Sequence, residues 1–62
     1  MEDISLRDAM NRLGERERHI IDLRFYEGKT QMEVADEIGI SQAQVRRLEK
    51  HALRSMRNYL RN

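Results

Sequence analysis

The sequence of 62 residues has no cysteine, no proline and no tryptophan, and it has only three glycines. Because cysteine is missing, neither a disulfide nor a Cys-ligated zinc ion can stabilise the fold, and helix packing must do so instead. No linker-like or low-complexity segment divides the chain. Its length is near the lower limit at which one hydrophobic core stabilises a fold unaided, so we expect a single domain over residues 1–62.

Long apolar runs are missing as well. No segment approaches the roughly 18–20 consecutive apolar residues that a membrane-spanning helix requires. No signal peptide is visible at residues 1–3. We therefore expect a cytoplasmic protein without a membrane partner.

Charged residues make up 37% of the chain and apolar residues 39%, a balance that is typical of a compact helical domain with a charged surface. The charges are unevenly distributed. Residues 1–37 hold six Lys/Arg against ten Asp/Glu, a net charge of −4, whereas residues 38–62 hold six Lys/Arg against one acid, a net charge of +5. A basic C-terminal part joined to an acidic body is typical of a protein that binds a polyanion on one face. An ordinary solvated surface is the alternative interpretation of the same pattern.

Apolar periodicity and capping signals divide the chain into four expected helices, over residues 5–13, 15–26, 30–38 and 42–60. Ser5 is the expected N-cap of the first helix, with Asp8 as an acid in its first turn, a weak form of the capping box. Full capping boxes are expected to begin the last two helices, at Thr30–Glu33 and Ser41–Gln44.

Each helix carries apolar residues that we expect to be buried. The first helix presents one stripe, formed by Leu6, Ala9, Met10 and Leu13. The second helix has so many apolar residues near its end that we expect contacts from two sides, at Ile20, Ile21, Leu23 and Phe25. The buried stripe of the last helix consists of Val45, Leu48, Ala52, Met56 and Tyr59. The acidic residues are expected mostly on solvated faces or at helix N-termini.

The last two helices have the pattern of a helix-turn-helix. That motif needs a small residue where the helices touch, a turn residue that tolerates the left-handed conformation, and apolar residues that hold both helices. Ala35 and Gly39 fill the first two positions, and the apolar positions are Val34, Ile38, Ile40, Val45 and Leu48. We therefore predict an all-α fold, a compact four-helix domain containing a helix-turn-helix with a long C-terminal recognition helix. The alternative is a helical hairpin without a nucleic-acid role.

If the apolar stripe of the last helix faces the core, the outward side chains of its first turns face the DNA major groove. The candidate base-contacting residues are Gln42, Ala43, Arg46, Arg47 and Lys50. Glutamine pairs well with adenine, arginine with guanine, and an alanine methyl group can contact a thymine methyl group. Further along the helix, Arg54, Arg57 and Arg61 lie beyond base readout, so we expect a solvated or partner-binding face there.

Hydroxyl groups and helix N-terminal amides near these residues can bind phosphate. Thr30 and Ser41 supply the hydroxyl groups, and capping alone is the alternative role for each. Gln44 is a further candidate for a phosphate contact, although its capping role can occupy its side chain.

No arrangement typical of an enzyme is present. His19 and His51 have no Cys, His or Asp companions at metal-ligand spacing, and a surface or packing role is the better interpretation for both. The three glycines are isolated from one another, so no phosphate-cradling loop exists. We expect no enzymatic activity, no metal and no cofactor.

Two parts of the chain carry a family resemblance: the segment Leu13-Gly-Glu-Arg-Glu-Arg-His-Ile-Ile-Asp-Leu-Arg-Phe25, and the segment that starts at Gly28-Lys-Thr-Gln and contains the helix-turn-helix. Together they resemble domain 4 (region 4) of the sigma-70 family of bacterial RNA polymerase sigma factors, from about Leu6 to Tyr59. Similarity to the sporulation and general-stress branch is greatest in three segments: Lys29-Thr-Gln-Met-Glu-Val-Ala, Gly39-Ile-Ser-Gln-Ala-Gln-Val and Arg47-Leu-Glu-Lys. The resemblance implies a fragment of a larger sigma factor.

This resemblance implies that the last helix recognises the −35 element of double-stranded promoter DNA. It also implies phosphate contacts by Arg16, Arg24 and Thr30. It further implies that an apolar surface docks on the β-flap of the RNA polymerase core, for which the candidates are Phe25, Leu53, Met56, Tyr59 and Leu60.

The candidate base-contacting residues depart from the family pattern in two places. The housekeeping branch typically has an Arg-Glu pair where this chain has Gln42 and Ala43, and the lost acid removes an acceptor for cytosine N4. We therefore predict a −35 element that differs from the housekeeping one and depends less on G·C pairs. The sporulation branch commonly has a serine at the position of Arg46, where an arginine adds a phosphate or guanine contact.

Two other functions are compatible with the same helices. The effector domain of a two-component or quorum-sensing regulator uses a similar four-helix arrangement and usually dimerises through its last helix. A protein-only interaction domain would bind a regulator, such as an anti-sigma factor, without DNA. The resemblance of the second helix favours the sigma-factor interpretation over the regulator.

Overall fold

The computed structural model describes residues 5–61, so the expectations about a signal peptide at residues 1–3 and about the domain limits at 1 and 62 lie outside the described residues. Within this range the elements are α1 (Leu6–Asn11), α2 (Glu15–Ile21), the π-helical turn η1 (Asp22–Tyr26), α3 (Gln31–Ile38) and α4 (Gln42–Arg61). No strand occurs in residues 5–61. The predicted all-α fold with four helices is confirmed.

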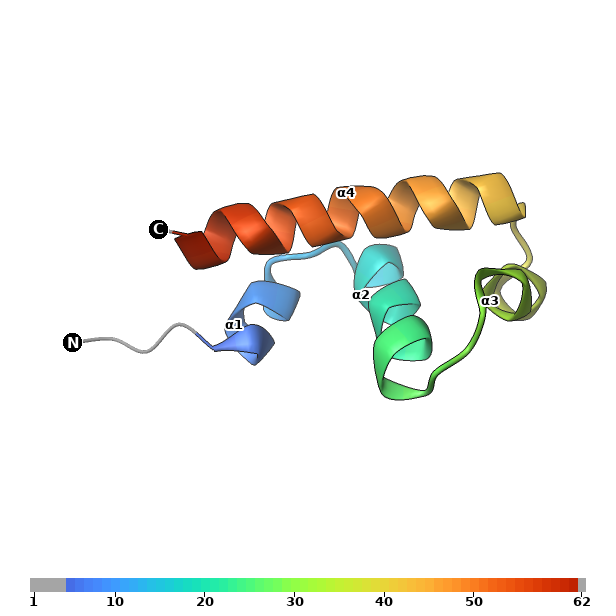
Figure 1. Ribbon diagram of the computed structural model, residues 1–62, viewed down its shortest axis with the longest axis horizontal. Coiled ribbons are helices and arrows are strands. Elements are labelled where there is room, and N and C mark those ends of the chain that lie inside the picture. The colour runs from blue at the N-terminus through green and yellow to red at the C-terminus, as the bar shows by residue number, and fades with distance from the viewer. Residues whose placement is uncertain (1–4, 62) are drawn as a thin grey trace.

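Helix α4 forms one long side of the molecule, and the three shorter helices lie along it (Figure 1). It has 20 residues, which corresponds to about 30 Å at the α-helical rise. In Figure 1, α1 lies beneath its C-terminal part, α2 beneath its middle, and α3 is seen end-on beneath its N-terminal end. The described part of the chain is therefore elongated, with extents of 42 × 19 × 16 Å.

Capping boxes begin α1, α3 and α4, and those of α3 and α4 confirm the sequence prediction. At α3, the Thr30 hydroxyl accepts a hydrogen bond from the Glu33 amide at 3.1 Å, and the Glu33 carboxylate accepts one from the Thr30 amide at 2.8 Å. That backbone hydrogen bond lowers the pKa of Glu33, because it stabilises the charged carboxylate. Ser5 and Asp8 make the same reciprocal pair, so the first box is more complete than the sequence indicates.

Helix α1 is shorter than predicted. It ends at Asn11, because the amides of Arg12 and Leu13 donate to carbonyl groups only three residues back, at 3.2 and 3.0 Å. These tighter hydrogen bonds satisfy the last carbonyl groups and end the helix. The prediction that Leu6 is buried is wrong: its side chain is 50% exposed, at the first position of this short helix.

The second predicted helix changes geometry after Ile21. In the turn η1, the Glu27 amide donates at 3.1 Å to the Asp22 carbonyl five residues earlier, so more residues occupy each turn than in an α-helix. Side chains two residues apart lie on nearly opposite sides of a helix. Leu23 is buried, whereas Phe25 is 55% exposed, so the prediction that Phe25 is packed from two sides is wrong.

The core consists of two clusters side by side beneath α4. The first contains Ala9, Met10, Ile21, Ala52 and Met56, with Leu13 and Tyr59 packed against it. The second contains Ile20, Leu23, Val34, Ala35 and Val45, with Ile38, Ile40 and Leu48 packed against it. Since Ile20 and Ile21 belong to different clusters, the prediction that this helix is contacted from two sides is confirmed for its isoleucines.

The turn between α3 and α4 has the geometry that a helix-turn-helix requires. Gly39 has a φ of 85°, in the left-handed region. The amides of Gly39 and Ile40 both donate to the Ala35 carbonyl, at 2.8 and 3.2 Å, which is a common way to end a helix at a glycine. Ala35 is buried in the same cluster as Val45, so its small side chain lets α3 approach α4 closely.

We predict that Gly39→Ala lowers the free energy of unfolding by about 1 kcal/mol, because a Cβ atom strains a left-handed backbone. A Cβ atom at this position would meet no other atom within 4 Å, so the cost comes from the backbone and not from a clash. Gly39→Asn is the matched control, since asparagine tolerates this conformation and should cost less. Urea unfolding measures both variants, and an equal cost for the two would contradict the prediction.

Candidate nucleic-acid interface

The predicted base-contacting residues form one exposed face at the start of α4. All five side chains are exposed, namely Gln42, Ala43, Arg46, Arg47 and Lys50. At α-helical geometry they occupy an arc of about 140° and a length of about 13 Å. The major groove is about 12 Å wide, so one groove can accommodate this length of helix. The opposite side of α4 is buried through Val45 and Ala52, which fixes the direction of the exposed face.

The N-terminal end of α4 is held by its own capping box. The Gln44 amide donates to the Ser41 hydroxyl at 3.1 Å, and the Ser41 amide donates to Gln44 Oε1 at 3.3 Å. Capping therefore occupies the acceptor atom of the Gln44 side chain and leaves its Nε2 donors for a phosphate. Both predicted phosphate contacts at this end are exposed and lie beside the base-contacting face.

A buried carboxylate connects the other predicted phosphate contacts to α4. Glu49 is only 8% exposed, and its Oε1 accepts hydrogen bonds from Arg24 Nε at 2.8 Å and from Gln31 Nε2 at 3.4 Å. Arg24 also donates through Nη1 to the Lys29 carbonyl at 2.9 Å. The network joins η1, the start of α3 and the middle of α4. It brings Arg24 next to Thr30, the N-cap of α3.

The burial of Glu49 departs from the expectation that the acidic residues mostly lie on solvated faces. A signal was present in the sequence: Glu49 lies four residues after Val45 and three before Ala52, in phase with the buried stripe. It is also the one acid in residues 38–62. An acid inside an apolar stripe needs a buried partner, and no local pattern in the sequence identifies Arg24 as that partner.

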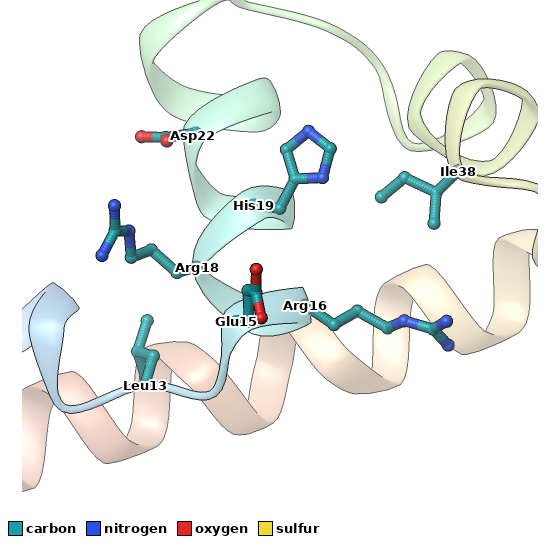
Figure 2. A pocket seen from close by; sticks show the side chains of 7 residues that line it. All are labelled: Leu13, Glu15, Arg16, Arg18, His19, Asp22 and Ile38. Carbon is teal, nitrogen blue, oxygen red and sulfur yellow. The ribbon is translucent and has the colours of Figure 1, made fainter.

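Arg16 lies apart from this network, in the first turn of α2. It lines an open cleft of mixed charge between α2 and the end of α3, together with Leu13, Glu15, Arg18, His19, Asp22 and Ile38. Figure 2 shows the Arg16 side chain extended to the side of α2 on which Ile38 lies, whereas Arg18 and Asp22 point to the other side. Arg16 is exposed and free to contact a phosphate on the α3 side of the molecule.

The predicted polymerase-contacting residues are only partly brought together. Phe25, Leu53 and Met56 line an apolar groove, which also includes Leu6, Met10, Ile21 and Tyr26. Met56 is only 6% exposed, which confirms the prediction that it belongs to the buried stripe of the last helix, and it also lines the groove. Tyr59 and Leu60 do not line this groove. The Tyr59 ring packs on the first cluster, with the Arg12 guanidinium 4.7 Å from its centre.

Four groove residues are not among the predicted polymerase-contacting residues, namely Leu6, Met10, Ile21 and Tyr26. They come from α1, α2 and η1, and only the packing of these elements against α4 makes them neighbours of Leu53. Two consecutive aromatic residues before Gly28 were the available signal for Tyr26, since a fully solvated helix end seldom needs both.

The two histidines, His51 and His19, differ in their surroundings. His51 Nδ1 lies 2.6 Å from Glu17 Oε2 and connects α4 to α2, while His19 is exposed. Within residues 5–61, no group of three or more His, Cys, Asp or Glu side chains is placed to hold a metal ion. No helix in the same range is long and apolar enough to cross a membrane.

The sequence of this chain matches a known family. Residues 9–58 match the family described as Sigma-70, region 4. The chain belongs to this family. An RNA polymerase sigma-G factor of Clostridium acetobutylicum is 58% identical to this region 4 chain over 60 residues, which cover 97% of the chain and 23% of the relative. A sigma-G factor of Bacillus subtilis is 59% identical over 90% of the chain and 22% of the relative. A sigma-F factor of Bacillus licheniformis is 53% identical over 92% and 22%.

The region 4 chain spans less than a quarter of the length of these curated relatives. No solved structure matches it. The sigma-70 resemblance that the sequence carries is confirmed, and the sigma-G and sigma-F relatives confirm its similarity to the sporulation branch.

Proposed function

We propose that this region 4 chain is the DNA-binding module of a sigma factor, and that it recognises the −35 element of a promoter during transcription initiation. The observation that carries the proposal is the exposed polar and cationic face at the start of α4, whose opposite side is buried against α3. The sigma-G and sigma-F relatives support it. In this role the module binds DNA and polymerase without catalysing a reaction, and it acts in the cytoplasm.

In the proposed complex, the start of α4 lies in the major groove. Gln42 pairs with adenine, Ala43 contacts a thymine methyl group, and Arg46 and Arg47 donate to guanine or to a nearby phosphate. Lys50, one turn further along, contacts a base or phosphate at the edge of the groove.

The proposed phosphate contacts surround this helix. Ser41 and Gln44 act at the N-terminal end of α4, where the capping box leaves the Gln44 Nε2 donors available and the Ser41 hydroxyl donates to Gln44 Oε1 over a long 3.5 Å. Thr30 and Arg24 act at the N-terminal end of α3, and Arg16 acts from α2. Phosphate contacts fix the orientation of the domain on the duplex, and base contacts then supply the sequence preference.

The base preference is testable by selection. We expect duplexes recovered from a random pool to lack the housekeeping −35 hexamer and to depend less on G·C pairs, because Ala43 cannot accept a hydrogen bond from cytosine N4. Sequencing of the bound pool after several rounds measures this. Recovery of the housekeeping hexamer would refute the predicted preference.

On a selected duplex, we expect Arg47→Ala to weaken binding by about 1–3 kcal/mol while the domain stays folded, because Arg47 is exposed and makes a base contact. Arg61→Ala is the matched control: it removes the same charge from the same helix, beyond the groove. Val45→Asp should abolish both folding and binding, since it places a charge in the second cluster. Fluorescence anisotropy and circular dichroism measure the two properties. Equal losses for Arg47→Ala and Arg61→Ala would count against the assignment.

The two alternative functions make different predictions. Membership of the sigma-70 region 4 family disfavours a two-component or quorum-sensing effector domain. A domain that binds only a protein regulator, such as an anti-sigma factor, would show no salt-dependent DNA affinity. The proposed module should show an affinity that falls steeply with salt, because cations released from the phosphates drive binding.

We also propose that the apolar groove docks on RNA polymerase, on the β-flap of the core enzyme. Phe25 and Leu53 are 55% and 40% exposed and lie on the same groove, over a lining that includes Met56. Leu60, which is also exposed, extends the apolar surface toward the end of α4. Tyr59 contributes indirectly, by packing beneath this end of the helix.

Leu53→Ser should weaken binding to core RNA polymerase by about tenfold, because it removes apolar surface that the interface would bury. DNA affinity should not change. Met32→Ser is the matched control, since Met32 is exposed on α3 and is not part of the groove lining. A pull-down titration with core enzyme measures the effect. Polymerase binding that survives Leu53→Ser would exclude the groove as the docking surface.

A further inference from the structure

Glu49 is the least expected charged residue in the fold. It lies on the buried side of α4, three residues after Arg46 and one before Lys50, and its side chain is 10% exposed. A carboxylate removed from water is costly unless charged and hydrogen-bonding partners surround it. Glu49 has two donors, Arg24 from η1 and Gln31 from α3.

These contacts fix the Arg24 guanidinium on several sides. Nε donates to Glu49, Nη1 donates to the Lys29 carbonyl, and the guanidinium carbon lies 5.6 Å from the centre of the Phe25 ring. Among residues 5–61, no hydrogen bond occupies Nη2. The Arg24 side chain is 26% exposed, so part of it reaches the surface.

The fixed arginine lies at the N-terminal end of α3. Lys29 and Gln31, which flank the N-cap Thr30 in the chain, both take part in the network. The first amides of a helix have no partner within that helix. The free donor of Arg24 and the N-terminal end of α3 therefore lie close together on the surface. Glu49 holds both of them there, and it belongs to α4, the helix proposed to contact the bases.

We propose that Glu49 is a positioning residue for DNA binding: it holds Arg24 and the start of α3 so that their phosphate contacts are in register with the bases that α4 reads. The inference rests on the proposed function. An arginine that is already immobilised loses little rotamer freedom when it binds a phosphate, so Glu49 raises affinity although it is itself negative.

The test is a double-mutant cycle with the 62-residue chain and a selected duplex over a range of salt concentrations. Glu49→Gln should weaken binding by about fivefold, the cost of ordering one side chain. Arg24→Ala should lower the slope of log Kd against log salt concentration by about 0.9, the value for one phosphate. Glu49→Gln should lower this slope toward the same value. In the Arg24→Ala background, Glu49→Gln should have no further effect on affinity.

Glu37→Gln is the matched control. Glu37 makes an exposed ion pair with Lys29 at 3.6 Å, so the substitution removes the same charge without touching Arg24. It should leave DNA affinity unchanged or slightly higher. If Glu49→Gln behaves like this control, or binds DNA more tightly than the unchanged chain, the proposal is overturned, because Glu49 then only repels the phosphates.

Unfolding measurements accompany every variant, since Glu49→Gln leaves Arg24 without its carboxylate. If that variant does not fold, Arg24→Lys replaces it: lysine keeps the charge, but its single nitrogen cannot occupy the positions of Nε, Nη1 and Nη2 at once, so it cannot reproduce both fixed contacts and a third to phosphate. Arg24→Lys should bind as weakly as Arg24→Ala, and unchanged affinity would overturn the proposal. Additive effects of Arg24→Ala and Glu49→Gln would also overturn it. Absence of salt-dependent binding by the unchanged chain would instead refute the proposed function.

Discussion

Two adjacent isoleucines of α2 pack into different hydrophobic clusters, and the rest of the fold depends on this double burial. Ile21 joins α1 to the C-terminal half of α4, while Ile20 joins α3 to its N-terminal half. A chain this short has too few residues for one large core. By placing α2 between two small clusters, the fold gives α4 support along most of its length, so that one rigid helix can carry two surfaces.

The polar network of Glu49 adds orientation to this apolar support. Hydrophobic contacts are non-directional and can tolerate a small rotation of one helix against another, whereas the hydrogen bonds from Arg24 and Gln31 to one carboxylate oxygen are directional and restrict that rotation. Removing ions from water offsets much of the energy that such a pair provides. We therefore interpret the network as a device that sets the angle between α3 and α4 rather than as a large source of stability.

Helix α4 divides its functions along its length. Its first turns carry the proposed base-contacting face. Leu53, in its middle, lines the apolar groove that is proposed to dock on RNA polymerase. The two surfaces meet at Arg24 and Phe25, adjacent residues of η1: the first pairs with Glu49 and the second lines the groove. Within the π-helical turn Leu23 is buried, Phe25 is exposed and Arg24 pairs with Glu49.

Much of this protein followed from the sequence alone. Capping boxes, the left-handed Gly39 and the stripe of α4 are local signals that act over three or four residues, so the helices, the helix-turn-helix and the exposed face at Gln42–Lys50 could be predicted. The tertiary structure alone decided the π-helical turn, the exposure of Leu6 and Phe25, the groove, and the pairing of Arg24 with Glu49. The groove and the Arg24–Glu49 pair join residues far apart in the chain, 25 positions apart for that pair. No local pattern encodes which distant side chain will neutralise a buried carboxylate.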